Sequence, residues 1–422
     1  MIHLRTVSAL PKCFSEFARI LCLLAGFATP ALYADEANFS YHDTIIRAWQ
    51  LQFDAAIDSK GVIHLIADQY YQFNLAGRQL TTESQAQDLQ GFSLAFPPAI
   101  SLDPEGNAHM LVRGPGSFDA GFDISYRVRK ANGSWLDSTR NYQPSSTEAR
   151  NYVVGLAALS ADEVYAHTSA VGSNIWGDLR FWELGEQSAL STGKWSGVWR
   201  ADLDTRMRTH NGKVYFATAN GFTSDDVFFS IAYGGPNLLP DLKRNVHRHH
   251  AGSSKKGNPD ISIDQSGNAH LVYGAYQEVY YNQYRANGQK VYSTDQRILG
   301  SLGTWWLNFG ISAVGASADG SKILVAGLKT NGHKEASHSK IVLTYSADRG
   351  KTWSEQIETG QLTHGGEGRM RPRVLAYRDK FVILYFDSRN IGISMAVIDM
   401  NSLKSSNGAA VAPVISALLL LN

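Results

Sequence analysis

Apolar and polar residues alternate along much of the chain, in short runs that are separated by turn residues. Three stretches align closely. Each is an alternating run, a turn of Asp-x-x-Gly type and a second run that begins with histidine, and they span 55–67, 99–112 and 260–273. A period of two is typical of a half-buried strand, and Asp followed by Gly is typical of a tight turn. Each stretch therefore predicts a pair of antiparallel strands.

Weaker copies of this pattern recur along the rest of the chain, at 156–169, 207–219, 313–327 and 373–386. The seven copies begin roughly 45 to 60 residues apart, which leaves room for two more strands in each unit. Stretches such as 123–135, 279–292 and 340–353 have the composition of that second pair. We therefore predict an all-β, seven-bladed β-propeller of four-stranded antiparallel blades. Six blades are the alternative, because the third and fourth units are weak.

The two ends of the chain differ in composition from this repeat. Basic residues precede an apolar run at 20–34, so 1–34 is interpreted as a signal peptide, which predicts a secreted or periplasmic protein. The propeller is expected over 35–404, with the segment after Ala34 adding a strand that closes the last blade. The tail, 405–422, is either a sorting signal or disordered. Both apolar end segments are too short for a stable membrane span.

Charge and cysteine content narrow the function classes. The chain has 39 basic and 38 acidic residues, a formal net charge of +1, which argues against a nucleic-acid partner bound through bulk charge. Its two cysteines, Cys13 and Cys22, both fall within the predicted signal peptide. A mature chain without cysteine would have no disulfide and no thiolate metal site.

Histidines at equivalent repeat positions suggest a metal site at first sight. His64, His109 and His270 each follow the turn of their own unit, however, and equivalent positions in a ring do not converge. We interpret them as structural residues that bond to the neighbouring turn. The basic loop 245–259 holds three further histidines and is expected to face the substrate, with a metal site there as the alternative. No cofactor is predicted, and the sequence assigns no ligands for a structural metal ion.

In a propeller, the site is expected at the mouth of the central channel, beside the segments before each first strand and after each second strand. Arginines and aromatic residues are frequent there, whereas Asp68 and Asp387 are the carboxylates that the pattern places at the mouth. Guanidinium groups suit carboxylate or sulfate, and aromatic faces suit sugar rings. An acidic polysaccharide is therefore the predicted partner, unless these arginines pair with local aspartates. The predicted substrate-binding residues are Arg113, Arg150, Asn258, Trp305, Trp306, Arg373 and Arg389.

Residues 346–353, "SADRGKTW", carry the Ser-x-Asp-x-Gly-x-Thr-Trp pattern of an Asp box. The chain thereby resembles the BNR/Asp-box propellers, a group with sialidases, other glycan hydrolases and ulvan-type polysaccharide lyases. We expect the box to form the turn between the third and fourth strands of a blade, far from the channel. The Phe-Arg-Ile-Pro segment of sialidases has no counterpart, since 44–56 reads "TIIRAWQLQFDAA".

The resemblance to ulvan lyases implies an activity. Those enzymes use His, Tyr and Arg to eliminate across a uronic acid, so the resemblance implies His167 and Tyr276 for proton transfer. Arg206, Arg371 or Arg389 would neutralise the carboxylate. The leading prediction is thus a polysaccharide lyase that acts by β-elimination. A sialidase-like glycoside hydrolase and a non-catalytic glycan-binding propeller remain as alternatives.

Overall fold

The structure is a computed structural model in which the chain divides into two units, Met1–Asn38 and Phe39–Asn422. All of the described residues belong to the second unit. They are 39–47, 53–67, 69–83, 98–113, 124–136, 140–142, 151–171, 177–184, 189–195, 205–219, 226–249, 256–275, 277–302, 311–330, 339–363, 371–387 and 392–403. The predicted signal peptide and the predicted tail, 405–422, lie outside them. Within the described part of the chain, no helix is long and apolar enough to cross a membrane.

The described strands form four-stranded antiparallel sheets, of which there are seven. The first three sheets along the chain are β2 (Asp54–Ile57), β3 (Ile63–Ile66), β4 (Tyr70–Phe73) and β5 (Gln79–Glu83); β6 (Ala99–Leu102), β7 (Ala108–Arg113), β8 (Ile124–Arg129) and β9 (Arg140–Tyr142); and β10 (Asn151–Ala158), β11 (Val164–Val171), β12 (Gly177–Leu184) and β13 (Ala189–Trp195). In each of them, strands that follow one another in sequence are neighbours in the sheet.

The next three sheets have the same order. They are β14 (Thr205–His210), β15 (Lys213–Ala219), β16 (Val227–Tyr233) and β17 (His247–His249); β18 (Lys256–Ile263), β19 (Ala269–Ala275), β20 (Glu278–Tyr284) and β21 (Gln296–Leu299); and β22 (Ser312–Ala316), β23 (Ile323–Lys329), β24 (Ser339–Ser346) and β25 (Ile357–Thr363). A short helix, α2 (Leu238–Arg244), lies between β16 and β17 in the sequence.

The last sheet takes its strands from both ends of the described chain. Its order is β1-β28-β27-β26, with β1 (Phe39–Arg47), β26 (Arg373–Tyr377), β27 (Lys380–Asp387) and β28 (Gly392–Asp399), and the short 3-10 helix η5 (Met400–Ser402) follows β28. β1 pairs with β28 from Phe39, opposite Ile398, to Arg47, opposite Gly392. The prediction that the N-terminal segment adds a strand to the last blade is confirmed.

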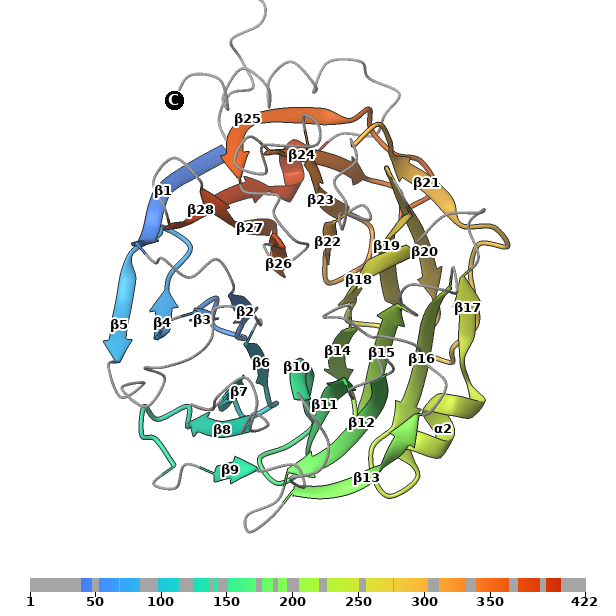
Figure 1. Cartoon of the computed structure of the whole chain (residues 1–422). Coiled ribbons are helices and arrows are strands. Elements are labelled where there is room, and N and C mark those ends of the chain that lie inside the picture. The colour runs from blue at the N-terminus through green and yellow to red at the C-terminus, as the bar shows by residue number, and fades with distance from the viewer. Residues whose placement is uncertain are drawn as a thin grey trace, which may run out of the picture. The chain divides into compact units, whose positions relative to one another are not determined.

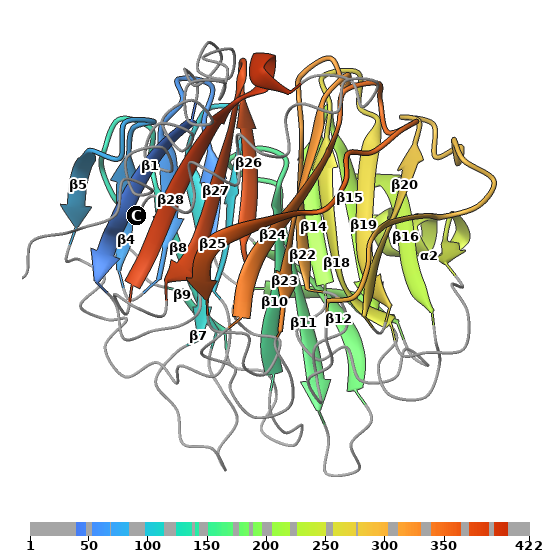
Figure 2. The same cartoon turned by 90° about the horizontal axis from the view of Figure 1, so that it is seen from above.

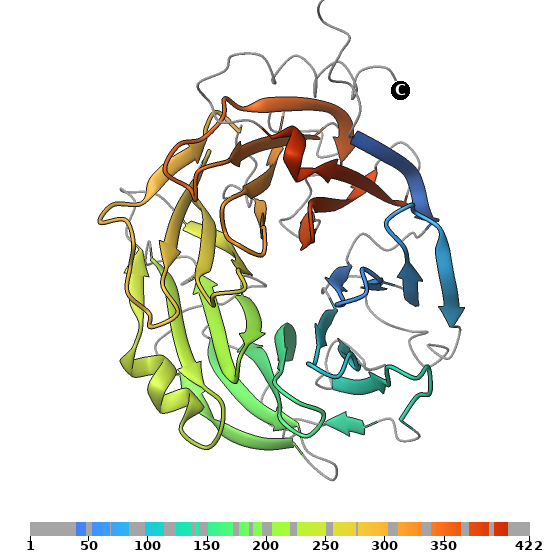
Figure 3. The same cartoon turned by 180° about the vertical axis from the view of Figure 1, so that it is seen from behind.

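The first strands of the sheets lie side by side around a common centre. Contacts run from β2 through β6, β10, β14, β18, β22 and β26 and back to β2 (Figure 1). Figure 3 shows the same ring from behind, and Figure 2 shows the sheets edge-on. The predicted all-β propeller of four-stranded antiparallel blades is therefore confirmed, and its inner wall is made of the first strands.

The turns between first and second strands follow the predicted chemistry. Oδ1 of Asp58 accepts hydrogen bonds from the backbone N–H groups of Lys60 and Val62, at 2.9 and 2.8 Å. Gly61 has a φ of 83°, a left-handed conformation that favours glycine. Side-chain acceptance and a permissive backbone together reverse the chain within a few residues.

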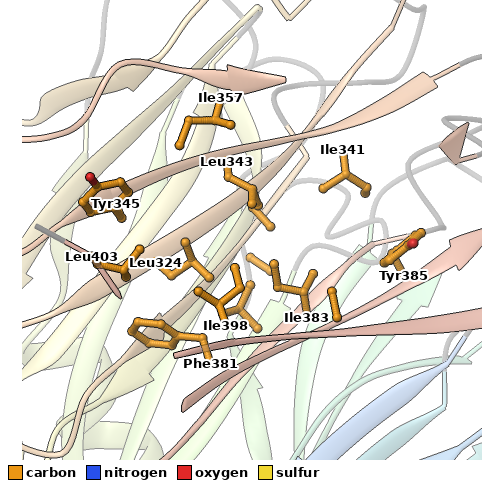
Figure 4. Packing of buried hydrophobic residues seen from close by; sticks show 14 of the residues in the cluster. Leu324, Ile341, Leu343, Tyr345, Ile357, Phe381, Ile383, Tyr385, Ile398 and Leu403 are labelled. Carbon is orange, nitrogen blue, oxygen red and sulfur yellow. The ribbon is translucent and has the colours of Figure 1, made fainter. Parts of the chain in front are cut away.

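The core consists of layers between neighbouring sheets rather than one central mass. Between β22–β25 and the last sheet, for example, Leu324, Leu343 and Ile357 pack against Phe381, Ile383 and Ile398 (Figure 4). Every sheet thus buries one face against the sheet before it and the other face against the sheet after it. Such packing between sheets supplies the hydrophobic stabilisation of a chain whose described residues include no cysteine.

The stretch 346–353 forms the turn between β24 and β25, the third and fourth strands of their sheet, as predicted. Oδ1 of Asp348 accepts a hydrogen bond from the Thr352 backbone N–H at 2.9 Å, and Gly350 has a φ of 79°. The Trp353 ring lies edge-on to Tyr281 of the previous sheet, with ring centroids 4.9 Å apart. This turn therefore fastens two sheets together on the outer part of the propeller.

Candidate functional site

Two inner strands carry arginines at alternate positions. Arg206 and Arg208 lie on β14, whereas Arg373 begins β26 and Arg371 lies just before it. Side chains two residues apart on a strand point to the same face, so each pair points the same way. Arg206, Arg371 and Arg373 are each no more than 7% exposed. Burial of so many guanidinium groups requires carboxylates or another anion nearby.

Asp54, the first residue of β2, is the carboxylate that joins the two arginine pairs. The Nε–H of Arg373 donates to Oδ1 of Asp54 at 2.6 Å, and Nη1 of Arg206 lies 4.0 Å from the same oxygen. Oδ2 accepts a hydrogen bond from the backbone N–H of Ile100, on β6, at 3.1 Å. Since β2 and β14 are not neighbours in the ring, the contact between Asp54 and Arg206 spans its centre.

Asp260, on β18, is the second carboxylate at this level. Its Oδ1 lies 3.4 Å from Nε of Arg206 and 3.8 Å from Nη2 of Arg208. Its Oδ2 accepts a hydrogen bond from the backbone N–H of Val314, on β22, at 3.0 Å. We call Asp54, Arg206, Arg208, Asp260, Arg371 and Arg373 the central arginine cluster.

The central arginine cluster holds more positive than negative charge. Among its members, four guanidinium groups accompany two carboxylates, and three of the four guanidinium groups are buried. Nε of Arg206 and Oδ1 of Asp260 are buried, and neither makes a hydrogen bond within the described residues. A small anion can accept a hydrogen bond from the Nε–H of Arg206, because charge-assisted hydrogen bonds are strong where water is scarce.

The pKa values of the cluster record this imbalance. Burial, together with the charge of Arg373, lowers the pKa of Arg371 to about 9. Burial and Arg373 likewise lower the pKa of Arg206 to about 10, although Asp54 and Asp260 oppose the change. Burial alone would raise the pKa of Asp54, but Arg373 and Arg206 outweigh it and hold that pKa below its ordinary value.

Of the predicted site residues, Arg206, Arg371 and Arg373 are brought together here. Asn258 lies on β18 two residues before Asp260, buried and with a φ of 54°. Arg113 ends β7, but its side chain is outside the description. The predicted residues that lie outside the described part of the chain are Arg150, Tyr276, Trp305, Trp306 and Arg389.

His167 differs from its expected setting. Its side chain is buried on β11, with its ring edge-on to Phe216 of the next sheet at 5.2 Å between centroids. Burial lowers the pKa of His167 to about 3. A group that exchanges protons in catalysis works best with a pKa near the operating pH, and His167 in this environment is a far weaker base than that.

Asp54 and Asp260 are functional candidates that the sequence reasoning missed. It named Asp68 and Asp387 as the mouth carboxylates; Asp68 lies outside the described residues, and Asp387 is buried at the end of β27, opposite Gly392. The sequence does contain a sign that these two aspartates are related. The segments "FDAAID" and "PDISID" place Asp54 and Asp260 at the same position of two repeat units, four residues before the turn aspartates Asp58 and Asp264.

The repeated histidines are structural, as predicted. Nδ1 of His109 is hydrogen-bonded to the Tyr126 hydroxyl at 2.6 Å, and Nε2 lies 3.1 Å from Oδ2 of Asp103 in the adjoining turn. His64 and His270 likewise bond to Tyr70 and Tyr281. Their Nε2 atoms lie 3.5 and 3.7 Å from the turn aspartates Asp58 and Asp264, beyond hydrogen-bonding geometry. Groups of three or more potential metal ligands are absent from the described residues.

In the predicted basic loop, His249 bonds to protein groups through both ring nitrogens. Nδ1 lies 2.9 Å from Oδ2 of Asp295, and Nε2 is hydrogen-bonded to the Tyr284 hydroxyl. Tyr284 ends β20, and Asp295 directly precedes β21, so both partners belong to the next blade along the ring. His249 therefore links two sheets, and His250 lies outside the described residues.

The class of protein that the fold defines is a β-propeller with a charged centre. No family model matches the chain, and no curated protein matches it. Solved structures similar to the chain include the Hadza microbial sialidase Hz136, at 11% identity over 81% of this chain and 74% of that one, with a TM-score of 0.47. Another is the polysaccharide lyase Uly1, at 11% identity over 86% and 92%, with a TM-score of 0.45.

A third similar structure is the alpha-L-arabinanase of Penicillium chrysogenum in complex with arabinobiose. It is 12% identical over 73% of this chain and 94% of that one, with a TM-score of 0.43. At identities of 11 to 12%, these similarities concern the fold alone, so any activity has to be argued from the side chains of the site.

Proposed function

We propose that the central arginine cluster binds the acid group of an acidic saccharide. The observation that carries this proposal is that the cluster gathers four guanidinium groups, three of them buried, beside two carboxylates at the centre of the ring, an excess of positive charge among its members. A bound carboxylate or sulfate would neutralise part of that excess and would raise the lowered pKa values of Arg206 and Arg371. An anion that binds only the folded protein would also stabilise it, by an amount that grows with the anion concentration relative to Kd.

The reaction that we propose is β-elimination by a polysaccharide lyase. A base removes the C5 proton of a uronic acid, the C4–C5 double bond forms, the C4–O bond breaks, and the departing sugar oxygen takes up a proton. Arg371 and Arg206 would stabilise the negative charge that develops on the carboxylate. Tyr276 remains the proposed proton-transfer residue, whereas His167, with a pKa of about 3, would need a changed environment to act as a base.

Glycoside hydrolysis is the second candidate, and one observation favours it. Asp54 and Asp260 both contact Arg206, which places two carboxylates at the centre of the ring. Hydrolysis needs one of two carboxyl groups protonated as the general acid. The pKa of Asp54 is lowered, which opposes that role and leaves elimination ahead. A propeller that only binds the saccharide is the third candidate. For all three, we propose a secreted or periplasmic protein.

The test begins with binding and product formation on a uronic-acid polysaccharide. The wild-type protein is incubated with polygalacturonate, and the ultraviolet absorbance of the new double bond is followed together with reducing ends. Rising absorbance supports the lyase. Reducing ends without absorbance support the hydrolase, and binding without either product supports the binding propeller. An absence of binding to polygalacturonate and to sulfated polysaccharides would overturn the proposal.

The site assignment is tested with Arg371→Met, which removes one guanidinium group and keeps most of the side-chain volume. We expect loss of binding to the acidic saccharide, by about tenfold or more, because one charge-assisted contact is removed. Arg78→Met is the matched control, since Arg78 is an exposed turn residue between β4 and β5. Equal affinities of the two variants would contradict the assignment of the central arginine cluster.

A further inference from the structure

A groove lies between the sheet β14–β17 and the next sheet, at the far end of β14 from Arg206. Its volume is about 660 Å³, within the usual range of small-molecule sites. Its walls come from the end of β16, from α2 and the residues that follow it, and from the turn between β20 and β21. α2 lies along the outer side of this sheet (Figure 1). We call this site the lateral groove, defined by Lys213, Tyr233, Arg244, Asn245, His247 and Gln289.

The lateral groove has an exposed aromatic ring in its wall. Tyr233, the last residue of β16, is 64% exposed, and it is the one aromatic side chain among the exposed large apolar residues that the structure describes. Nζ of Lys213 lies 4.9 Å from the centroid of its ring and donates a hydrogen bond to the carbonyl oxygen of Ala286 at 2.8 Å. The ammonium group is therefore held in place and still has N–H donors for a ligand.

Polar side chains surround this ring on the other walls. Asn245 and Gln289 carry amides, which both donate and accept, as vicinal hydroxyl groups require. Arg244 is paired with Asp241 at 3.2 Å but is largely exposed, and burial beside His249 lowers the pKa of His247. When His247 is neutral, the lateral groove holds two positive side chains, Lys213 and Arg244, and one negative side chain, Asp241. Its net charge is then positive by one.

From this arrangement we propose that the lateral groove is a second saccharide-binding site, which takes one acidic sugar unit. The sugar ring would stack on Tyr233, its carboxylate would lie between Lys213 and Arg244, and its hydroxyl groups would bond to Asn245 and Gln289. The site is separate from the central arginine cluster. Arg206, a member of that cluster, lies near the start of β14, whereas Lys213 follows the turn after His210, the last residue of β14. Binding here would hold a polymer to the propeller without using the centre of the ring.

The experiment is titration calorimetry of the full chain with trigalacturonate, with its methyl ester as the matched neutral probe. Tyr233→Ala should remove one binding site, or weaken it about tenfold, while Tyr233→Phe should retain it because the ring remains. Lys213→Met should weaken trigalacturonate and leave the methyl ester unchanged. Leu80→Ala is the control, since Leu80 is a similarly exposed apolar side chain on β5.

Two outcomes would overturn the inference. One is a Tyr233→Ala protein that binds trigalacturonate with unchanged stoichiometry and affinity. The other is a groove that binds adenosine monophosphate and no saccharide. Combination with Arg371→Met separates this site from the central one: loss of binding in Tyr233→Ala but not in Arg371→Met would refute the central proposal and support the lateral groove, and the reverse would do the opposite.

Discussion

Two sets of polar residues occupy equivalent repeat positions in this propeller and behave differently. His64, His109 and His270 each bond to a tyrosine of their own sheet and face an aspartate of their own turn, although only His109 is within hydrogen-bonding distance of that aspartate. Asp54 and Asp260 also share a repeat position, but both reach Arg206 of a third sheet. The histidines follow a turn at one end of the inner strands, whereas the aspartates lie on the inner strands themselves, Asp54 at the start of β2 and Asp260 within β18.

The difference shows what a ring does to repeated residues. A side chain whose partners lie in the same unit is satisfied once in every unit, and the copies never meet. A side chain on an inner strand shares the centre with the inner strands of the other units, and a long arginine can join two copies. Convergence therefore depends on the strand that carries a residue, and repetition alone predicts a structural role only for residues away from the centre.

Removal of Asp54 should have the largest effect. Asp54→Ala leaves Arg373 and Arg206 buried beside a lost carboxylate, and breaking a buried ion pair in this way typically costs about 3–5 kcal/mol. The free energy of unfolding in urea measures the loss. Asp379→Ala, at an exposed turn between β26 and β27, is the control and should change it by less than about 0.5 kcal/mol.

The cause can be checked in the same background. Asp54→Ala combined with Arg373→Met should recover part of the loss, because the unpaired charge is then removed. If Asp54→Ala unfolds at the same urea concentration as the wild-type protein, Asp54 contributes little to the free energy of unfolding. The aspartates and the repeated histidines would then not differ as proposed.

Lowering the pH should destabilise the protein through His167, whose pKa is lowered by burial alone. Burial lowers the folded pKa of His167 to about 3, below its ordinary value of 6.5. The unfolded state therefore takes up a proton first, and stability that is present above pH 6.5 is lost as the pH falls towards 3. The loss is about 1.4 kcal/mol per pH unit inside this window.

The measurement is a series of urea unfolding curves for the wild-type protein and for His167→Gln. The difference in unfolding free energy between the two proteins should shrink as the pH is lowered from 6.5, because only the wild-type chain loses this term. Parallel pH curves would show that His167 titrates normally and is not held in a dry environment.

The smallest effects are expected at the repeated histidines. His109→Phe leaves the Tyr126 hydroxyl and the Asp103 carboxylate without one partner, at a cost of about 1–3 kcal/mol. His64→Phe and His270→Phe should add within about 0.5 kcal/mol, since they lie in different sheets and share no partner. Asp54→Asn and Asp260→Asn should deviate from additivity by more than that, because both contact Arg206. If the losses of unfolding free energy were additive for the two aspartate substitutions and non-additive for the two histidine substitutions, the contrast between the two sets of residues would be wrong.

The fold was accessible from the sequence because its signals are local. The alternation and the Asp-to-Gly turns identify the first two strands of each unit, including the weak copies that became β10–β11 and β14–β15. The role of the N-terminal segment followed from the need to complete the last blade. α2 was not predicted, since Pro240 falls inside its short apolar pattern and a seven-residue helix depends on packing of Leu238, Leu239 and Leu242.

The site was only partly accessible, because its contacts join residues that are far apart in the sequence. Alternation of Arg371 and Arg373 predicted a shared face, but nothing local indicates that Asp54 accepts from Arg373 more than three hundred residues away. The clear alternation of the first repeat begins at Ala55, so the pattern alone does not include Asp54. His167 was judged by its position after a strand, and burial against Phe216 is invisible at that level.

The last sheet joins β1 to β28, so the earliest described strand of the chain has its partner near the end of the described residues. During synthesis, β1 has to wait, unpaired along that edge, until β28 has left the ribosome. A chain that is released before β28 cannot complete this sheet and leaves the edge of β1 without its partner strand. Closure of the ring therefore depends on complete translation, because the last sheet needs strands from both ends of the described chain.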